Sequence, residues 1–135
     1  MSIHRFEART AVAAGLDEVW SFFSDPGNLA AITPPELGFQ IRSNLPERVY
    51  PGLIVVYRVQ PLGPLPTTWV TEITYVDEGR LFVDEQRAGP YRLWHHEHHF
   101  RAVGDATVDR VRRVTHAGSV RSSISQAWSS ECQAM

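Results

Sequence analysis

The chain has 135 residues, 43% of them hydrophobic, which is typical of one globular domain with a core of its own. Its single cysteine, Cys132, cannot form an intramolecular disulfide, so a disulfide scaffold and a cysteine-rich zinc site are both excluded. The formal net charge of −2, with arginines scattered along the sequence, argues against a nucleic-acid partner.

The first part of the chain predicts a strand followed by two short helices. Apolar and polar residues alternate over residues 4–13, as in a strand with one solvated face. From Leu16 to Phe23 apolar residues recur every three or four positions, with acidic residues in the first turn, which predicts an amphipathic helix. Residues 25–27 (DPG) end it, and residues 28–32 can form a second short helix.

The rest of the chain predicts short strands separated by turn-forming residues. These strands are Phe39–Ser43, Leu53–Gln60, Thr67–Val76, Arg80–Arg87 and Arg92–Val103. Short links between successive strands favour an antiparallel meander. We therefore predict an α+β fold and disfavour a parallel α/β architecture.

Alternate apolar residues identify the inward face of each strand. They are Leu53, Val55, Tyr57 and Val59 in one strand, and Trp69, Thr71, Ile73 and Tyr75 in the next. A loop of two or four residues around Gly89 would pair Glu85 with Trp94 and Val83 with His96. This register places Leu81, Val83, Glu85, Trp94, His96, His98 and Phe100 inward, and a slip of one residue would exchange the two faces.

Polar residues on this aromatic face predict a cavity, because polar groups are costly to bury without partners. Aromatic walls with a few polar groups are typical of small-molecule sites. We predict a ligand site lined by Tyr57, Trp69, Thr71, Ile73, Tyr75, Val83, Glu85, Trp94, His96, His98 and Phe100. Phe22, Phe23 and the loop 33–37 are candidates for its mouth, although plain core packing is favoured for the two phenylalanines.

The run of residues 95–99 (HHEHH) allows two further interpretations. His96 and His98 project the same way from a strand and could hold a metal, but Glu85 is the only inward third ligand nearby, so no metal is predicted. Glu85 opposite His96 could also transfer protons, which makes Glu85, His96 and His98 the candidate catalytic groups. Neither a nucleophilic triad nor a phosphate-binding loop accompanies them, and no cofactor is predicted.

Several blocks of sequence carry a family resemblance. They are residues 19–26 (VWSFFSDP), 28–29 (NL), 32–35 (ITPP) and 37–39 (LGF), then 82–86 (FVDEQ), 89–96 (GPYRLWHH) and Phe100. Over about residues 3–108 the chain resembles the bacterial ligand-binding SRPBCC proteins, members of the START and birch-pollen-allergen superfamily related to polyketide cyclases and coenzyme Q-binding proteins. The resemblance implies a helix-grip fold, in which a curved antiparallel sheet wraps a long C-terminal helix and a hydrophobic ligand lies between them.

Residues 109–135 depart from the family pattern. This end is short and rich in serine, a poor helix former, so the C-terminal helix is expected to be short or altered. Natural divergence and a reading-frame slip near residues 108–113 both account for the change. If this segment does not close the groove, a homodimer would cover the exposed apolar face.

Together these features predict a single domain over residues 1–135 that binds or transports a small hydrophobic molecule, such as a lipid, quinone or polyketide. The alternatives are an enzyme similar to a cyclase or dehydratase, and a small regulatory or accessory module. No stretch of the chain approaches the ~20 apolar residues of a membrane span, and no apolar signal core stands at the N-terminus. We therefore expect a cytoplasmic protein.

Overall fold

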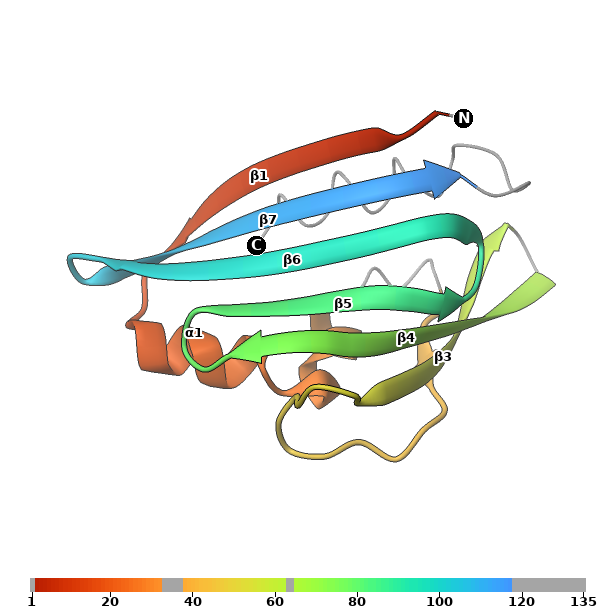
Figure 1. Ribbon diagram of the computed structural model, residues 1–135. Helices are drawn as coiled ribbons and strands as arrows, with labels where there is room; N and C mark the ends of the chain where they lie inside the picture. Colours follow the sequence, from red (N-terminus) through yellow and green to blue (C-terminus); the bar gives the residue numbers. More distant parts are fainter. Residues whose placement is uncertain (1, 33–37, 63–64, 118–135) are drawn as a thin grey trace.

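The computed structural model describes residues 2–32, 38–62 and 65–117. One seven-stranded antiparallel sheet runs in the order β1-β7-β6-β5-β4-β3-β2, and α1 lies across one face of it (Figure 1). This is the predicted α+β helix-grip architecture. The elements are β1 (His4–Val12), α1 (Leu16–Phe23), η1 (Pro26–Ile32), β2 (Gln40–Ile41), β3 (Ile54–Leu62), β4 (Leu65–Asp77), β5 (Leu81–Ala88), β6 (Tyr91–Val103) and β7 (Ala106–Ala117).

Helix α1 is attached to the inner face of the sheet through Trp20. Its indole ring packs edge-on against Phe82 and Phe100, with centroids 6.1 and 5.6 Å away. The indole Nε1 donates a hydrogen bond to Glu78 Oε1 at 2.9 Å, so the turn between β4 and β5 also holds the helix. Within the described ranges, no helix is long and apolar enough to cross a membrane.

Strand β7 is the element that the sequence pattern misses. It pairs with β1 on one side and with β6 on the other. Its buried residues are mostly polar, which hides the apolar alternation by which strands are recognised: Thr107, Asp109, Val111, Arg113 and Thr115. The departure of this region from the family pattern is therefore compatible with a regular strand as far as Ala117. The C-terminal helix, and the homodimer that depends on it, concern residues outside the described part and stay predictions.

The hairpin of β5 and β6 has a register one residue away from the expected one. Asp84 pairs with His96, whereas the sequence predicts Val83 as the partner of His96. Regular pairing stops before Gln86, whose side-chain amide instead binds the backbone N–H and carbonyl of Tyr91. The expected inward positions of Leu81, Val83 and Glu85 are therefore wrong, and β5 turns Phe82 and Asp84 inward.

A bulge in β4 explains a second difference. Ile73 pairs with Asp84 but Tyr75 pairs with Val83, so Thr74 is an extra residue that reverses the alternation. Tyr75 is consequently 52% exposed on the outer face, and Val76 packs against the core instead. The inward positions predicted for β3 are all confirmed, since Leu53, Val55, Tyr57 and Val59 are buried.

Candidate functional site

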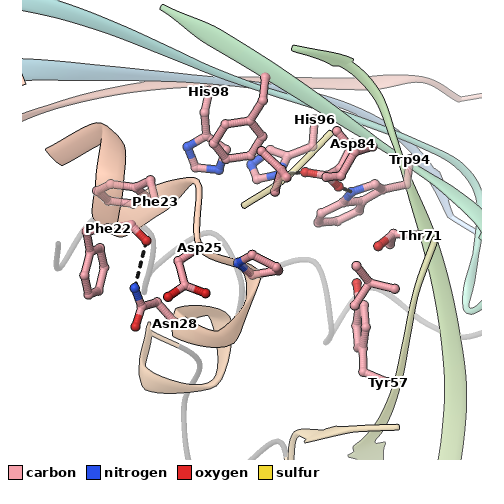
Figure 2. A pocket seen from close by; sticks show the side chains of 15 residues that line it. Phe22, Phe23, Asp25, Asn28, Tyr57, Thr71, Asp84, Trp94, His96 and His98 are labelled. Carbon is pink, nitrogen blue, oxygen red and sulfur yellow. Dashed lines mark hydrogen bonds and ion pairs between the residues drawn. The ribbon is translucent and has the colours of Figure 1, made fainter. Parts of the chain in front are cut away.

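A pocket opens between the inner face of the sheet and the segment of α1 and η1. Its cavity volume is about 90 Å³, and it opens to solvent. Figure 2 shows the sheet wall on one side, with Tyr57, Thr71, Asp84, Trp94, His96 and His98, and the helical wall opposite it. The remaining lining residues are Phe22, Phe23, Asp25, Pro26, Asn28, Val49, Val55, Ile73 and Phe82.

The most constrained polar group of the pocket is the carboxylate of Asp84. Trp94 Nε1 donates to its Oδ1 at 3.0 Å, and His96 Nδ1 lies 3.0 Å from its Oδ2. Burial alone would raise the pKa of Asp84, but His96 and the two hydrogen bonds outweigh it and hold that pKa below its ordinary value. Asp84 is therefore an ionised acceptor at neutral pH.

His96 is the neutral partner in this pair. Burial lowers the pKa of His96, and the charge of Asp84 offsets that effect only in part. A neutral imidazole that donates from Nδ1 to a carboxylate keeps Nε2 as its basic nitrogen. The pair thus presents a hydrogen-bond acceptor with base character to the pocket.

His98 extends the polar strip along β6. Its ring centroid lies 4.5 Å from that of His96, and it stacks on Phe82 at 4.9 Å. On its other side, His98 Nδ1 lies 3.4 Å from Oδ2 of the buried Asp109 on β7. Two histidines in succession along the inner face are therefore each oriented by an aspartate from a neighbouring strand.

The other end of the sheet wall is aromatic. Tyr57 lies on β3 with its ring 5.4 Å from that of Trp69, which in turn meets Trp94 edge-on at 5.0 Å. Burial, and then the charge of Asp84, raise the pKa of Tyr57 well above its ordinary value. Its hydroxyl group is consequently neutral and can donate a hydrogen bond inside the pocket.

The segment opposite the sheet supplies the mouth of the pocket. Phe22 is 40% exposed at the rim, whereas Phe23 packs on Phe100 and His98 with ring centroids 5.3 and 5.9 Å away. Asn28 Nδ2 donates to the carbonyl of Phe22 at 2.9 Å, which ties η1 to the end of α1 (Figure 2). Both phenylalanines line the pocket, so the packing role favoured for Phe22 is wrong. The loop 33–37, the other predicted part of the mouth, lies outside the described residues.

The structure brings together six of the residues predicted to line the ligand site: Tyr57, Thr71, Ile73, Trp94, His96 and His98. Trp69 and Phe100 are buried in the core beside the pocket. The other three project from the outer face, because of the register and the bulge: Tyr75, Val83 and Glu85. Their expected position on the inner face is wrong, and Asp84 stands opposite His96 where the catalytic hypothesis needs Glu85. Their contact with a ligand stays a prediction.

Sequence reasoning missed Asp84, the central acid of the pocket. The signal that could have found it is Phe82, the bulkiest apolar side chain of its strand. Its burial requires Asp84, two residues along, to face inward as well. In place of facing His96, Glu85 accepts a hydrogen bond from His95 on the outer face, with Nδ1 and Oε1 2.9 Å apart. In the described part of the chain, no group of three or more His, Cys, Asp or Glu side chains is arranged to hold a metal ion.

Comparison with solved structures identifies the fold. The chain is similar to Ara h 8.0201, with a TM-score of 0.70, 12% identity and coverage of 98% of this chain and 92% of that one. For the Zhui aromatase/cyclase of a Streptomyces species the TM-score is 0.69 at 18% identity, covering 89% and 72%. For norcoclaurine synthase of Thalictrum flavum it is 0.64 at 20% identity, covering 86% and 70%. No protein-family model and no curated protein matches the sequence. The chain therefore has the SRPBCC, or birch-pollen-allergen-like, fold.

Proposed function

We propose that this protein binds a small, mostly aromatic molecule bearing one hydrogen-bonding group in the pocket between the sheet and α1. The observation that carries the proposal is the Asp84–His96 pair, which is held by Trp94 in surroundings that are mostly apolar. Isolated polar groups of this kind fix the orientation of a ligand whose body is bound by apolar contact. A solved norcoclaurine synthase of the same fold is a complex with dopamine and hydroxybenzaldehyde, which are both small aromatic compounds with polar groups.

The test compares two probes that differ by one hydroxyl group. 2-Naphthol and naphthalene offer nearly the same apolar surface, but only 2-naphthol can donate a hydrogen bond to His96. We expect 2-naphthol to bind about three- to tenfold more tightly, which is the net contribution of one hydrogen bond. Affinities are measured by NMR titration of the full chain.

A matched pair of variants assigns the effect to the pocket. His96→Phe keeps a ring but removes the acceptor, so the preference for 2-naphthol should disappear. His95→Phe makes the same change one residue away, on the outer face, and should preserve the preference. Equal affinity of the wild-type protein for both probes, or equal loss in both variants, would contradict the proposal.

A second candidate function, proton transfer, is favoured by the same pair. A carboxylate that orients a neutral imidazole is a common arrangement for a general base. The predicted role of Glu85 in a cyclase-like reaction thus passes to Asp84 as the orienting acid and His96 as the base. The likeness to a structure described as an aromatase/cyclase adds support at the level of the fold.

Deuterium exchange tests this candidate without knowledge of the natural substrate. 2-Tetralone is a bicyclic ketone whose protons next to the carbonyl are weakly acidic, so a general base in the pocket should exchange them in D₂O. We expect His96→Phe to lose the exchange and His95→Phe to retain it. If the wild-type protein exchanges no faster than buffer, binding alone remains the proposed function.

A further inference from the structure

A second hollow lies on the outer face of the sheet, away from the pocket. It has a volume of about 1090 Å³ including open solvent, and it crosses the ends of β1, β7, β6 and β5. Four of its lining residues are arginines that lie far apart in the sequence, Arg9, Arg80, Arg101 and Arg110. The only acidic residue in this lining is Asp77. The sheet order thus gathers side chains that appear scattered along the chain.

The strand register places like charges directly opposite one another. Arg9 of β1 faces Arg110 of β7, and Arg110 faces His99 of β6. Opposed like charges on one face destabilise a pair of strands. Arg9 and Arg110 therefore repel each other, and an anion bound between them would relieve that repulsion.

The neighbouring row shows how the same strands neutralise their charges elsewhere. Arg112 of β7 stands between Glu7 of β1 and Glu97 of β6. Its guanidinium nitrogens lie 4.0 Å from a Glu7 oxygen and 3.5 Å from a Glu97 oxygen. In this row, positive and negative groups alternate.

The row of Arg9, Arg110 and His99 contains no acidic residue that would balance its arginines. Among the described residues, its two ends contact acids of the neighbouring row: Arg9 forms an ion pair with Glu7 at 3.5 Å, and His99 Nε2 lies 2.6 Å from Glu97 Oε2. The pair of Arg9 is well exposed to solvent and contributes little. Arg80, Arg101 and Arg110 form no ion pair with any residue that the structure describes.

The shape and surroundings of the hollow restrict the anion to a compact one. Guanidinium groups bind phosphate oxygens in pairs, which suits a tetrahedral anion with several oxygens. Acidic residues border the row, so an extended polyanion would meet repulsion beyond it. The half-buried Leu81 and Val108 in the lining offer apolar contact for an organic portion.

We propose that this hollow is a binding site for the phosphate or diphosphate group of a small organic molecule. Arg110 lies at its centre, where it faces both Arg9 and His99, and Arg80 and Arg101 complete the site. The site is separate from the inner pocket, so it stands independently of the function proposed above.

Inorganic pyrophosphate is the probe for this site. The full chain is titrated by calorimetry at constant ionic strength, with sodium chloride as the balancing salt. We expect saturable binding of one pyrophosphate, and an affinity at least about tenfold lower in Arg110→Gln, the cost of losing a charge-assisted hydrogen bond. Arg101→Gln, at an exposed position, should weaken binding in the same direction.

Arg92→Gln is the matched control, because Arg92 is exposed near the opposite end of β6 and its substitution removes the same charge. We expect its affinity to change by less than about twofold, as for a distant screened charge. Equal weakening in Arg92→Gln and Arg110→Gln, or no saturable binding, would overturn the proposal.

Two further measurements test the repulsion between the arginines and the source of the phosphate group. Thermal unfolding without pyrophosphate should show Arg110→Gln at least as stable as the wild type, because it removes a repulsion; a lower melting temperature would contradict that reasoning. Vesicles containing phosphatidic acid present the same phosphate chemistry on a membrane. Tight binding to vesicles without binding of pyrophosphate would replace the small molecule by a lipid surface and overturn the proposal as stated.

Discussion

The inner and outer faces of β6 use the same residue types in opposite environments. On the inner face His96 pairs with Asp84 in the pocket, whereas on the outer face His95 lies between Glu85 and Glu97, with Nδ1 and Nε2 each 2.9 Å from a carboxylate oxygen. Burial lowers the pKa of His96. The pKa of His95 is raised, because its two glutamates outweigh the effect of burial. One step along a strand therefore separates a buried imidazole that holds its proton less strongly than usual from a half-exposed one that holds it more strongly.

Substitutions at Phe100 and Tyr75 should differ most strongly in their effect on stability. Phe100 is 5% exposed and packs against Trp20, whereas Tyr75 is 52% exposed on the outer face. Phe100→Ala should lower the free energy of unfolding by about 3–5 kcal/mol. Tyr75→Ala should change it by no more than about 0.5 kcal/mol. Urea denaturation measures both, and similar losses in the two variants would refute the assignment of faces.

A smaller effect separates the two acids of β5. Asp84→Ala leaves the buried donors of Trp94 and His96 without their acceptor, which should cost about 2–4 kcal/mol. Glu85→Ala leaves His95 with its second glutamate at the surface and should cost less than about 1 kcal/mol. The same denaturation assay applies. A larger loss for Glu85→Ala than for Asp84→Ala would contradict the observed register and support the predicted one, in which Glu85 faces inward.

The pH dependence of stability should have opposite signs for the two histidines. The pKa of His96 lies below its unfolded value of 6.5, so the unfolded state binds protons more readily and stability falls as the pH drops below that value. The pKa of His95 lies above 6.5, so its contribution is present at low pH and is lost as the pH rises through the folded pKa.

Two variants separate these contributions. The free energy of unfolding of each variant is compared with that of the wild type between about pH 5.5 and 7.5. His96→Gln should reduce the loss of stability at low pH, and His95→Gln should reduce the gain of stability at low pH. The effect of His95 should be the smaller one, since its side chain is 32% exposed against 11% for His96. If both substitutions changed the pH dependence of the unfolding free energy in the same direction, the opposite pKa shifts of His96 and His95 would be refuted.

Much of this fold can be predicted from the sequence because most of its elements carry strong local signals. Helix α1 follows the spacing of its apolar residues, and β3 follows a strict alternation, so the sequence locates both within a residue or two. Strand β7 lacks that alternation, because its inward residues include Asp109 and Arg113. Those residues are accommodated through pairing with neighbouring strands, Asp109 beside His98 and Arg113 over the ring of Trp94. Such pairing is invisible in a single sequence.

The site is predictable only in part, because it depends on the hairpin register. The inward histidines of β6 follow from Trp94 and Phe100 on the same strand. The inward acid of β5 depends on whether an even or odd number of residues links the paired ends of the strands. Here regular pairing ends at Glu85 and His95, and the side chain of Gln86 binds the backbone of Tyr91 instead. A side-chain contact with the backbone inside the hairpin leaves no signature in the alternation of apolar residues.

Imidazole NMR spectra recorded during titration with 2-naphthol show which face of β6 meets the ligand, because the four histidines of residues 95–99 report on both faces at once. We predict that the side-chain nitrogen signals of His96 and His98 shift until the added 2-naphthol saturates the site, while those of His95 and His99 stay unchanged. Saturable shifts of His95 and His99, with His96 and His98 unaffected, would place the ligand on the outer face and contradict the account.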